Sequence, residues 1–234
     1  LENLDVETKI ITPGYATIPF KDYVIKDVDS FQVSVGKKTF TAELISTILP
    51  ESESVEVIFV RNEEYFDRDG IYVDSKTGEG FPDEAERFIF FMRAILRWME
   101  RSEWKPDILH SNDHHTALLP AYLREIEFDS TEMADMKSIF TIHNMGYQGI
   151  HAQSVLAKTG LPEKAYAGND VFDFHGDVNF MKVALRYADK INTVSPTYAK
   201  EIMSSEEYGF GLQDEIKKRA KDVSGILNGV DYSE

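Results

Sequence analysis

The sequence predicts an α/β fold, a parallel sheet with flanking helices. In the second half of the chain, short apolar runs alternate with amphipathic segments of helical period. This alternation is typical of strands that right-handed helical crossovers join into one parallel sheet. The chain has 234 residues, 42% of them hydrophobic and 28% charged, which is the composition of a globular protein with a sizeable core. Because no internal repeat or clear linker occurs, we expect a single domain over residues 1–234.

The first part of the chain is predicted to consist mainly of strands. Polar and apolar residues alternate between Tyr23 and Leu44 on both sides of Gly36, which is the pattern of a β-hairpin. Strands are predicted at residues 4–12, in both arms of this hairpin and at 55–60. A polar stretch from Arg61 to Pro82 follows, and we expect it to be a surface loop.

From Asp83 onward the hydrophobic pattern changes to a helical period. Asp83 and Glu86 are spaced as a capping pair, and apolar residues run densely from Phe88 to Trp98. A helix that is apolar on nearly every side is mostly buried, so we expect it to pack on a sheet. After Pro106 the predicted strands are 107–110, 138–142, 191–194 and 223–227. The predicted helices in this part are 116–124, 179–188, 196–203 and 212–220.

Charge and composition exclude several classes of protein. The 41 acidic residues outnumber the 25 basic ones, and the resulting net charge of −16 argues against binding to nucleic acid. No apolar run approaches the ~20 residues that a membrane helix needs. The absence of cysteine excludes disulfides, a thiolate nucleophile and Cys-ligated metal sites. No signal peptide is recognisable, so the cytoplasm is the expected compartment.

Polar side chains collect where the predicted strands end. In an open parallel sheet, ligands bind outside the carboxyl ends of the strands. These ends carry residues 110–113, 143–144, 195–196 and 228–229. Ser195 before Pro196 has the pattern of a helix cap, and His110 or His115 alone is also consistent with a capping or core role. Together the four ends predict a site that hydrogen-bonds a polyol or polarises a leaving group.

Several well-known site motifs are absent from the sequence. Neither a dinucleotide fingerprint nor a P-loop nor a GxSxG elbow occurs. Asp67, Asp69 and Asp74 lack the spacing and the final Glu of a calcium loop. The stretch that contains them is therefore interpreted as an ordinary surface loop.

Residues 113–115 suggest a metal site as an alternative to a polyol-binding site. This Asp-His-His triplet resembles the motif by which a family of metallophosphoesterases binds manganese. Asp27 and Asp29 imitate the upstream aspartate pair of that family, but they fall within the predicted hairpin instead of at the end of a parallel strand. A metal site would also leave His143 and Asn228 without a task, so the metallophosphoesterase is kept only as a minor alternative.

Four segments, in chain order, resemble bacterial glycogen synthases and plant starch synthases. They are Lys105–Glu125, Phe140–Ile150, Lys182–Ile202 and Gly225–Tyr232. The strings TIHN…YQG and LNGVD within them are specific to this group among sugar-nucleotide transferases. Tyr65–Gly70 and Arg87–Ala94 are similar to the segment before the family's long helix. The resemblance covers most of the chain.

The resemblance implies the N-terminal half of a GT-B type glycosyltransferase, in which two Rossmann-like domains face each other across a cleft. The complete enzyme would transfer glucose from ADP-glucose or UDP-glucose to the non-reducing end of an α-1,4-glucan, with retention of configuration. Such enzymes need no metal or other cofactor. The implied partners are the nucleotide sugar, the glucan and the C-terminal domain of the same protein. The implied compartment is the cytoplasm, or the plastid in a plant.

The resemblance also assigns roles to individual residues. His143 matches the active-site histidine that faces the transferred glucose, and Asp113 would lie on the sugar and acceptor side of the cleft. These two are the expected catalytic residues. The expected substrate-binding residues are Asn144, Tyr147, Gln148, Asn228 and His115. The family commonly has an aromatic residue where His114 stands, so the role of that position is open.

Parts of the family pattern have no counterpart in the sequence. The family begins with a strand and a Lys-x-Gly-Gly-Leu loop that contacts the nucleotide diphosphate, and its C-terminal domain carries the basic residues that neutralise this leaving group. Asp231-Tyr232 matches the point where the family crosses between its domains. We therefore expect the chain alone to be inactive. A catalytically inactive glucan-binding or regulatory fragment remains an alternative.

Overall fold

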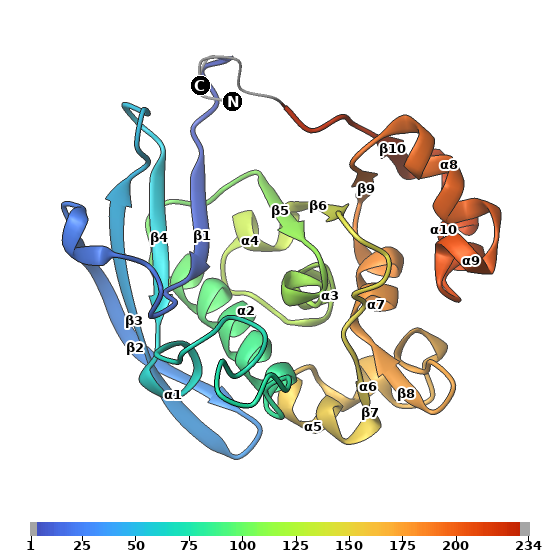
Figure 1. Ribbon diagram of the computed structural model, residues 1–234, viewed down its shortest axis with the longest axis horizontal. Coiled ribbons are helices and arrows are strands. Elements are labelled where there is room, and N and C mark those ends of the chain that lie inside the picture. The colour runs from blue at the N-terminus through green and yellow to red at the C-terminus, as the bar shows by residue number, and fades with distance from the viewer. Residues whose placement is uncertain (1–3, 230–234) are drawn as a thin grey trace. The chain divides into compact units, whose positions relative to one another are not determined.

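The computed structural model describes residues 4–229, and the chain divides into two compact units. The N-terminal unit is Leu1–Arg101 and the C-terminal unit is Ser102–Glu234. Each unit contains one four-stranded sheet, and the C-terminal unit also contains a two-stranded one (Figure 1). In the part of the chain described here, no helix is long and apolar enough to cross a membrane.

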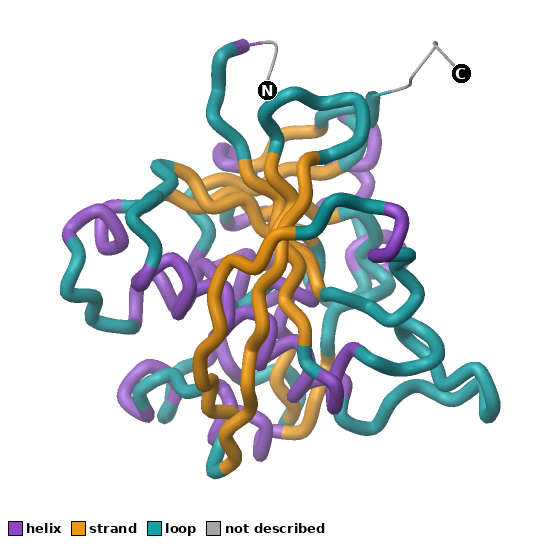
Figure 2. Tube along the Cα trace, turned by 90° about the vertical axis from the view of Figure 1, so that its left-hand side faces the viewer, coloured by secondary structure: helices purple, strands orange, loops and turns teal. Residues whose placement is uncertain are grey.

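The sheet of the N-terminal unit is mixed, in the order β1-β4-β3-β2. Its strands are β1 Lys9–Pro13, β2 Lys26–Val35, β3 Lys38–Ile48 and β4 Glu56–Arg61. The predicted hairpin is confirmed, because β2 and β3 pair antiparallel around Gly36 (Figure 2). Gly36 has a positive φ of 59°, which glycine adopts at no steric cost. The first strand begins at Lys9 and not at Leu4 as predicted, and the Leu4 and Val6 side chains are exposed.

The predicted buried helix is confirmed as α2, Glu84–Arg101, which packs against β2 and β4. Eleven of its residues are buried, which agrees with its nearly continuous apolar pattern. The Asp83 carboxylate, predicted to cap this helix, accepts two hydrogen bonds from the Arg68 guanidinium, at 2.7 and 2.5 Å. Although burial alone would raise the pKa of Asp83, these bonds and the arginine charge lower it.

Arg87 of α2 is wholly buried and anchors the stretch from Arg61 to Pro82. Its Nε donates to the Tyr65 carbonyl (2.8 Å) and its Nη1 to the Ile71 carbonyl (3.0 Å). The Phe81 ring lies 4.7 Å from the guanidinium carbon. This stretch also contains a short helix, α1 Glu63–Phe66, whose aromatic residues are buried. It is therefore partly core, not only the surface loop that its polarity predicted.

The four-stranded sheet of the C-terminal unit is entirely parallel, as predicted, in the order β10-β9-β6-β5 (Figure 1). Its strands are β5 Ile108–Asn112, β6 Lys137–Ile142, β9 Lys190–Thr193 and β10 Val223–Gly225. The predicted helices are found as α3 Leu119–Glu125, α7 Phe180–Tyr187, α8 Pro196–Ser204 and α10 Gln213–Lys218. The last strand is shorter than predicted: it ends at Gly225, and Ile226 and Leu227 beyond it are exposed.

Several short elements of the C-terminal unit were not predicted. They are α4 Thr131–Asp135, α5 Leu156–Thr159, α6 Glu163–Tyr166, α9 Glu206–Gly209 and the antiparallel pair β7 Ile150–Ala152 with β8 Asp177–Asn179. One turn of helix cannot display a 3.6-residue period and is not stable in isolation. The tertiary structure, not the local sequence, decides where these elements form.

Candidate functional site

The residues expected to form the site follow the carboxyl ends of the parallel strands of the C-terminal unit. Asp113 directly follows β5 and His143 directly follows β6, its neighbour in the sheet. Ser195 follows β9, and its hydroxyl accepts the Tyr198 N–H at 2.9 Å. Ser195 is thus the N-cap of α8, as the sequence pattern indicated.

Asp113 and His143 form a doubly hydrogen-bonded pair. The Asp113 carboxylate accepts the His143 backbone N–H through Oδ1 at 2.8 Å, and its Oδ2 lies 3.0 Å from the ring Nδ1. A carboxylate can only accept, so the histidine proton is on Nδ1 and the other ring nitrogen, Nε2, is the atom that can address a ligand. The side chains are 26% and 43% exposed, respectively. The pair is therefore fixed in orientation and accessible from solvent.

The Asp113 backbone is strained. Its φ of 56° and ψ of −175° fall in a region that is essentially restricted to glycine and costs about 1–3 kcal/mol for other residues. Backbone hydrogen bonds hold it there, from Asp113 N–H to the Thr141 carbonyl (3.0 Å) and from Thr116 N–H to the Asp113 carbonyl (3.2 Å). Strain of this kind is concentrated at functional sites, where it fixes a side chain in one direction.

A line of hydrogen bonds crosses three strands close to this pair. His110 Nε2 lies 2.6 Å from the Thr141 hydroxyl, which in turn donates to Asn192 Oδ1 at 2.5 Å. Loss of solvent around the His110 ring lowers its pKa, and the neighbouring His143 lowers it further. The lowered pKa favours the neutral form of the His110 ring.

His114 and His115 are packed against each other, with ring centroids 3.8 Å apart. His114 is buried, and the loop passes directly over it at Gly149, where a Cβ would lie 3.0 Å from the His114 Cβ. Position 114, where the resemblance implies an aromatic residue, is thus held by a buried imidazole. His115 is only partly buried.

The loop after β6 carries three of the expected substrate-binding residues, which differ in their exposure to solvent. Asn144 is exposed, and its Oδ1 accepts the Gly146 N–H at 2.8 Å. Tyr147 is 67% exposed. Gln148 is buried: its Nε2 donates to the Met145 carbonyl (3.0 Å), and its Oε1 accepts from Asn179 at 2.5 Å.

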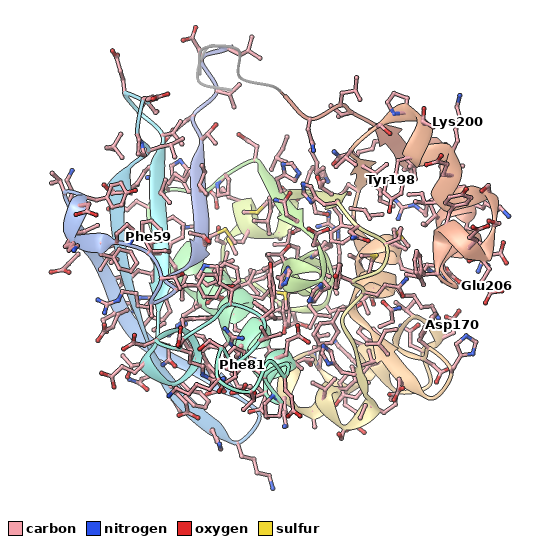
Figure 3. The ribbon with its side chains drawn as sticks, viewed as in Figure 1. Phe59, Phe81, Asp170, Tyr198, Lys200 and Glu206 are labelled. Carbon is pink, nitrogen blue, oxygen red and sulfur yellow. The ribbon has the colours of Figure 1, made fainter. Side chains whose placement is uncertain are left out.

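The same loop is held to neighbouring elements at two points. The Gln148 amide also donates to the Phe210 carbonyl at 3.2 Å. The Met145 N–H donates to the hydroxyl of Tyr198 on α8 at 3.1 Å, and Figure 3 labels this tyrosine. Gln148 thus orients the loop, while Asn144 and Tyr147 face solvent.

Asn228 lies apart from the pair. It is exposed and follows β10, which is separated from β6 by β9 in the sheet. Among the described residues, no hydrogen bond joins Asn228 to Asp113 or His143, which bond to each other instead. Residues 231 and 232, matched to the domain crossing, lie outside the described residues.

A metal site would need several ligand side chains close together. Over residues 4–229, no group of three or more His, Cys, Asp or Glu side chains could hold a metal ion. Asp27 and Asp29 lie on β2 of the antiparallel hairpin. Asp29 is occupied by Arg101, whose Nε and Nη2 donate at 2.7 and 3.0 Å. This aspartate pair is thus part of the hairpin, where the sequence had placed it.

Thr141 and Asn192 belong to this polar cluster and were missed in the sequence analysis. The available signal was a polar residue inside an otherwise apolar strand, in the strings FTIH and INTV. Both lie within strands, whereas Asp113 and His143, which predicted the site, come after the strands.

Comparison with known proteins gives a consistent result. The family model described as "Starch synthase catalytic domain" matches residues 1–218. A glycogen synthase of Clostridioides difficile (strain 630) is 38% identical over 99% of this chain, and one of Thermotoga maritima is 41% identical over 99%. The chain spans about half of these relatives, 47% of each. A solved structure, the catalytic domain of Starch Synthase IV from Arabidopsis thaliana bound to ADP and acarbose, matches 98% of this chain with a TM-score of 0.80 and 26% identity; the match covers 46% of that structure.

Proposed function

Because the chain belongs to the starch synthase catalytic domain family and has the fold of the N-terminal half of a GT-B glycosyltransferase, we propose that it supplies the sugar-binding half of a retaining glucosyltransferase. The complete protein transfers glucose from ADP-glucose or UDP-glucose to the non-reducing end of an α-1,4-glucan. It works without a metal or other cofactor, in the cytoplasm or, in a plant, the plastid. The observation that carries the proposal is the solvent-accessible Asp113–His143 pair, which two hydrogen bonds hold in place.

The chemistry of the pair suits a sugar. With Nδ1 engaged by Asp113, the His143 Nε2 accepts a hydrogen bond from a sugar hydroxyl when the ring is neutral. The exposed Asn144 and Tyr147 add an amide and an aromatic face on the same loop. Contacts that hold the sugar while its bond to the leaving group breaks stabilise an oxocarbenium-like transition state.

The other half of the chemistry needs positive charge. The nucleotide diphosphate leaves with negative charge, and cations aimed at it usually supply the largest catalytic contribution. With 41 acidic against 25 basic residues, this chain is poorly suited to that task. The proposal therefore assigns diphosphate binding to the C-terminal domain and expects the chain alone to transfer no glucose.

The test is His143→Ala in the full-length protein, assayed for transfer of radiolabelled glucose from ADP-glucose and UDP-glucose to glycogen. We expect kcat to fall on the order of 10²-fold, with KM changing less, because the lost contact tightens in the transition state. His175→Asn is the matched control, an exposed histidine with a positive φ that asparagine tolerates.

Two results would contradict the proposal. A variant with a lowered melting temperature but near-normal kcat would make His143 a structural residue. A full-length protein that binds glucan but shows no transfer from either donor would favour the binding module over the enzyme.

A further inference from the structure

The line of hydrogen bonds across three strands, formed by His110, Thr141 and Asn192, is here called the ladder. It joins β5, β6 and β9 side by side, with contacts of 2.6 and 2.5 Å. None of its three residues was assigned to substrate binding or catalysis above. Burying a polar side chain within a sheet costs free energy unless it is hydrogen-bonded. We therefore asked which part of the structure the ladder holds in place.

The direction of the hydrogen bonds in the ladder is determined by proton count. The Thr141 hydroxyl has one proton, which it donates to Asn192 Oδ1. It must therefore accept from His110, so the His110 proton is on Nε2. The lowered pKa of His110 agrees with a neutral ring that keeps this single tautomer.

Thr141 connects the ladder to the strained aspartate. Its side chain is fixed by His110 and Asn192, while its carbonyl accepts the Asp113 N–H at 3.0 Å. This bond and the one from the Thr116 N–H to the Asp113 carbonyl hold Asp113 in its glycine-like conformation. A shift of Thr141 would therefore move or release Asp113, and with it the carboxylate that orients His143.

We propose that Thr141 and His110 are positioning residues for the Asp113–His143 pair. They act through the strained backbone of Asp113 and need not touch the sugar. This inference rests on the proposed function, because its main readout is the rate of glucosyl transfer.

The experiment compares Thr141→Val with Thr141→Ser in the full-length protein. Valine keeps the shape but removes the hydroxyl, and we expect kcat to fall roughly tenfold with KM for donor and glucan within about twofold, since small misplacements of catalytic groups reduce the rate. Serine restores the hydroxyl and should restore kcat to within about twofold of the wild type. Thr159→Val is the control, because this buried threonine of the same unit donates to the Leu156 carbonyl (2.7 Å). Loss of its hydroxyl should lower stability without changing kcat.

Nuclear magnetic resonance can measure the tautomer of His110 directly, through the chemical shifts of its ring nitrogens. In protein labelled with ¹⁵N-histidine, the two ring nitrogens of His110 should have well-separated shifts that identify the Nε2–H tautomer. In Thr141→Val this separation should decrease, as the tautomers mix. If Thr141→Val does not fold, the rate assay is made with His110→Leu and His110→Gln instead. Leucine removes the N–H donor and should lower kcat roughly tenfold, whereas glutamine retains a donor and should restore kcat to within about twofold of the wild type.

The outcomes separate this inference from the proposed function. A Thr141→Val protein of lower melting temperature and unchanged kcat would overturn the positioning role while leaving the enzyme assignment intact. Equal loss of kcat in the valine and serine variants would also overturn it, since the hydroxyl would then not be the cause. Absence of glucosyl transfer in the wild-type protein would contradict the proposed function itself.

Discussion

Each unit holds a polar side chain in place by hydrogen bonds, but the two environments are opposite. In the N-terminal unit, Arg87 is wholly buried and donates hydrogen bonds to the carbonyls of Tyr65 and Ile71. In the C-terminal unit, Asp113 and His143 are held as firmly but remain accessible to solvent. A buried side chain bound to the backbone stabilises a fold, whereas a fixed and accessible one is available to a ligand. Exposure combined with rigidity, not polarity alone, distinguishes the candidate site.

The largest expected effect tests the structural side of this comparison. Arg87→Ala leaves two carbonyls without their donor and removes the stem that packs beside Phe81, so we expect the free energy of unfolding to fall by about 3 kcal/mol. Urea unfolding would measure it. The control is Arg97→Ala on the same helix: this exposed arginine should change stability by less than about 0.5 kcal/mol. Equal effects at the two sites would show that burial is not the deciding difference.

A pair of variants at Asp113 tests the functional side. Both Asp113→Gly and Asp113→Ala remove the carboxylate, so each should lower kcat of the full-length protein on the order of 10²-fold. Only glycine relieves the strained backbone, so Asp113→Gly should be more stable than Asp113→Ala by about 1–2 kcal/mol. Activity assays and thermal melts on the two proteins would decide. Identical stabilities would mean that the strain is not real.

The smallest effect concerns Asp189, a structural carboxylate within the C-terminal unit. Burial would raise its pKa, but the Ser138 N–H (2.8 Å), the Ser138 hydroxyl (3.0 Å) and Arg124 (2.7 Å) outweigh it and lower the pKa. A lowered pKa means that the ionised form stabilises the fold above the unfolded value of about 3.9, and that this stabilisation is lost as the pH falls through the folded value.

Asp189→Asn should therefore be less stable than the wild type at pH 7, by at most about 1 kcal/mol because the side chain is 34% exposed to screening solvent. The difference should shrink as the pH falls below about 4. Urea unfolding at pH 7, 5 and 3.5 would follow it, with the highly exposed Asp214→Asn as control. A difference that grows on acidification would refute the assigned sign.

The sequence predicted the position of the polar strand ends better than the packing beneath them. The pattern correctly placed Asp113 and His143 after neighbouring parallel strands, because strand ends are set by local pattern and the sheet brings them to one edge. It could not show that Gln148 turns inward while its neighbour Tyr147 faces solvent. Nor could it show that Arg87, a charged residue, lies in the core, since both outcomes depend on partners distant in the chain.

The glycine-like conformation of Asp113 also has a consequence for laboratory evolution. Every aspartate codon becomes a glycine codon by one base change, so the variant that relaxes this backbone is always a single mutation away. A library selected for heat resistance alone would tolerate that change, because the relieved strain offsets the lost contacts to His143. Stabilising campaigns on this protein therefore need an activity screen at every round, and recovery of glycine at position 113 would mark the clones in which function had been lost.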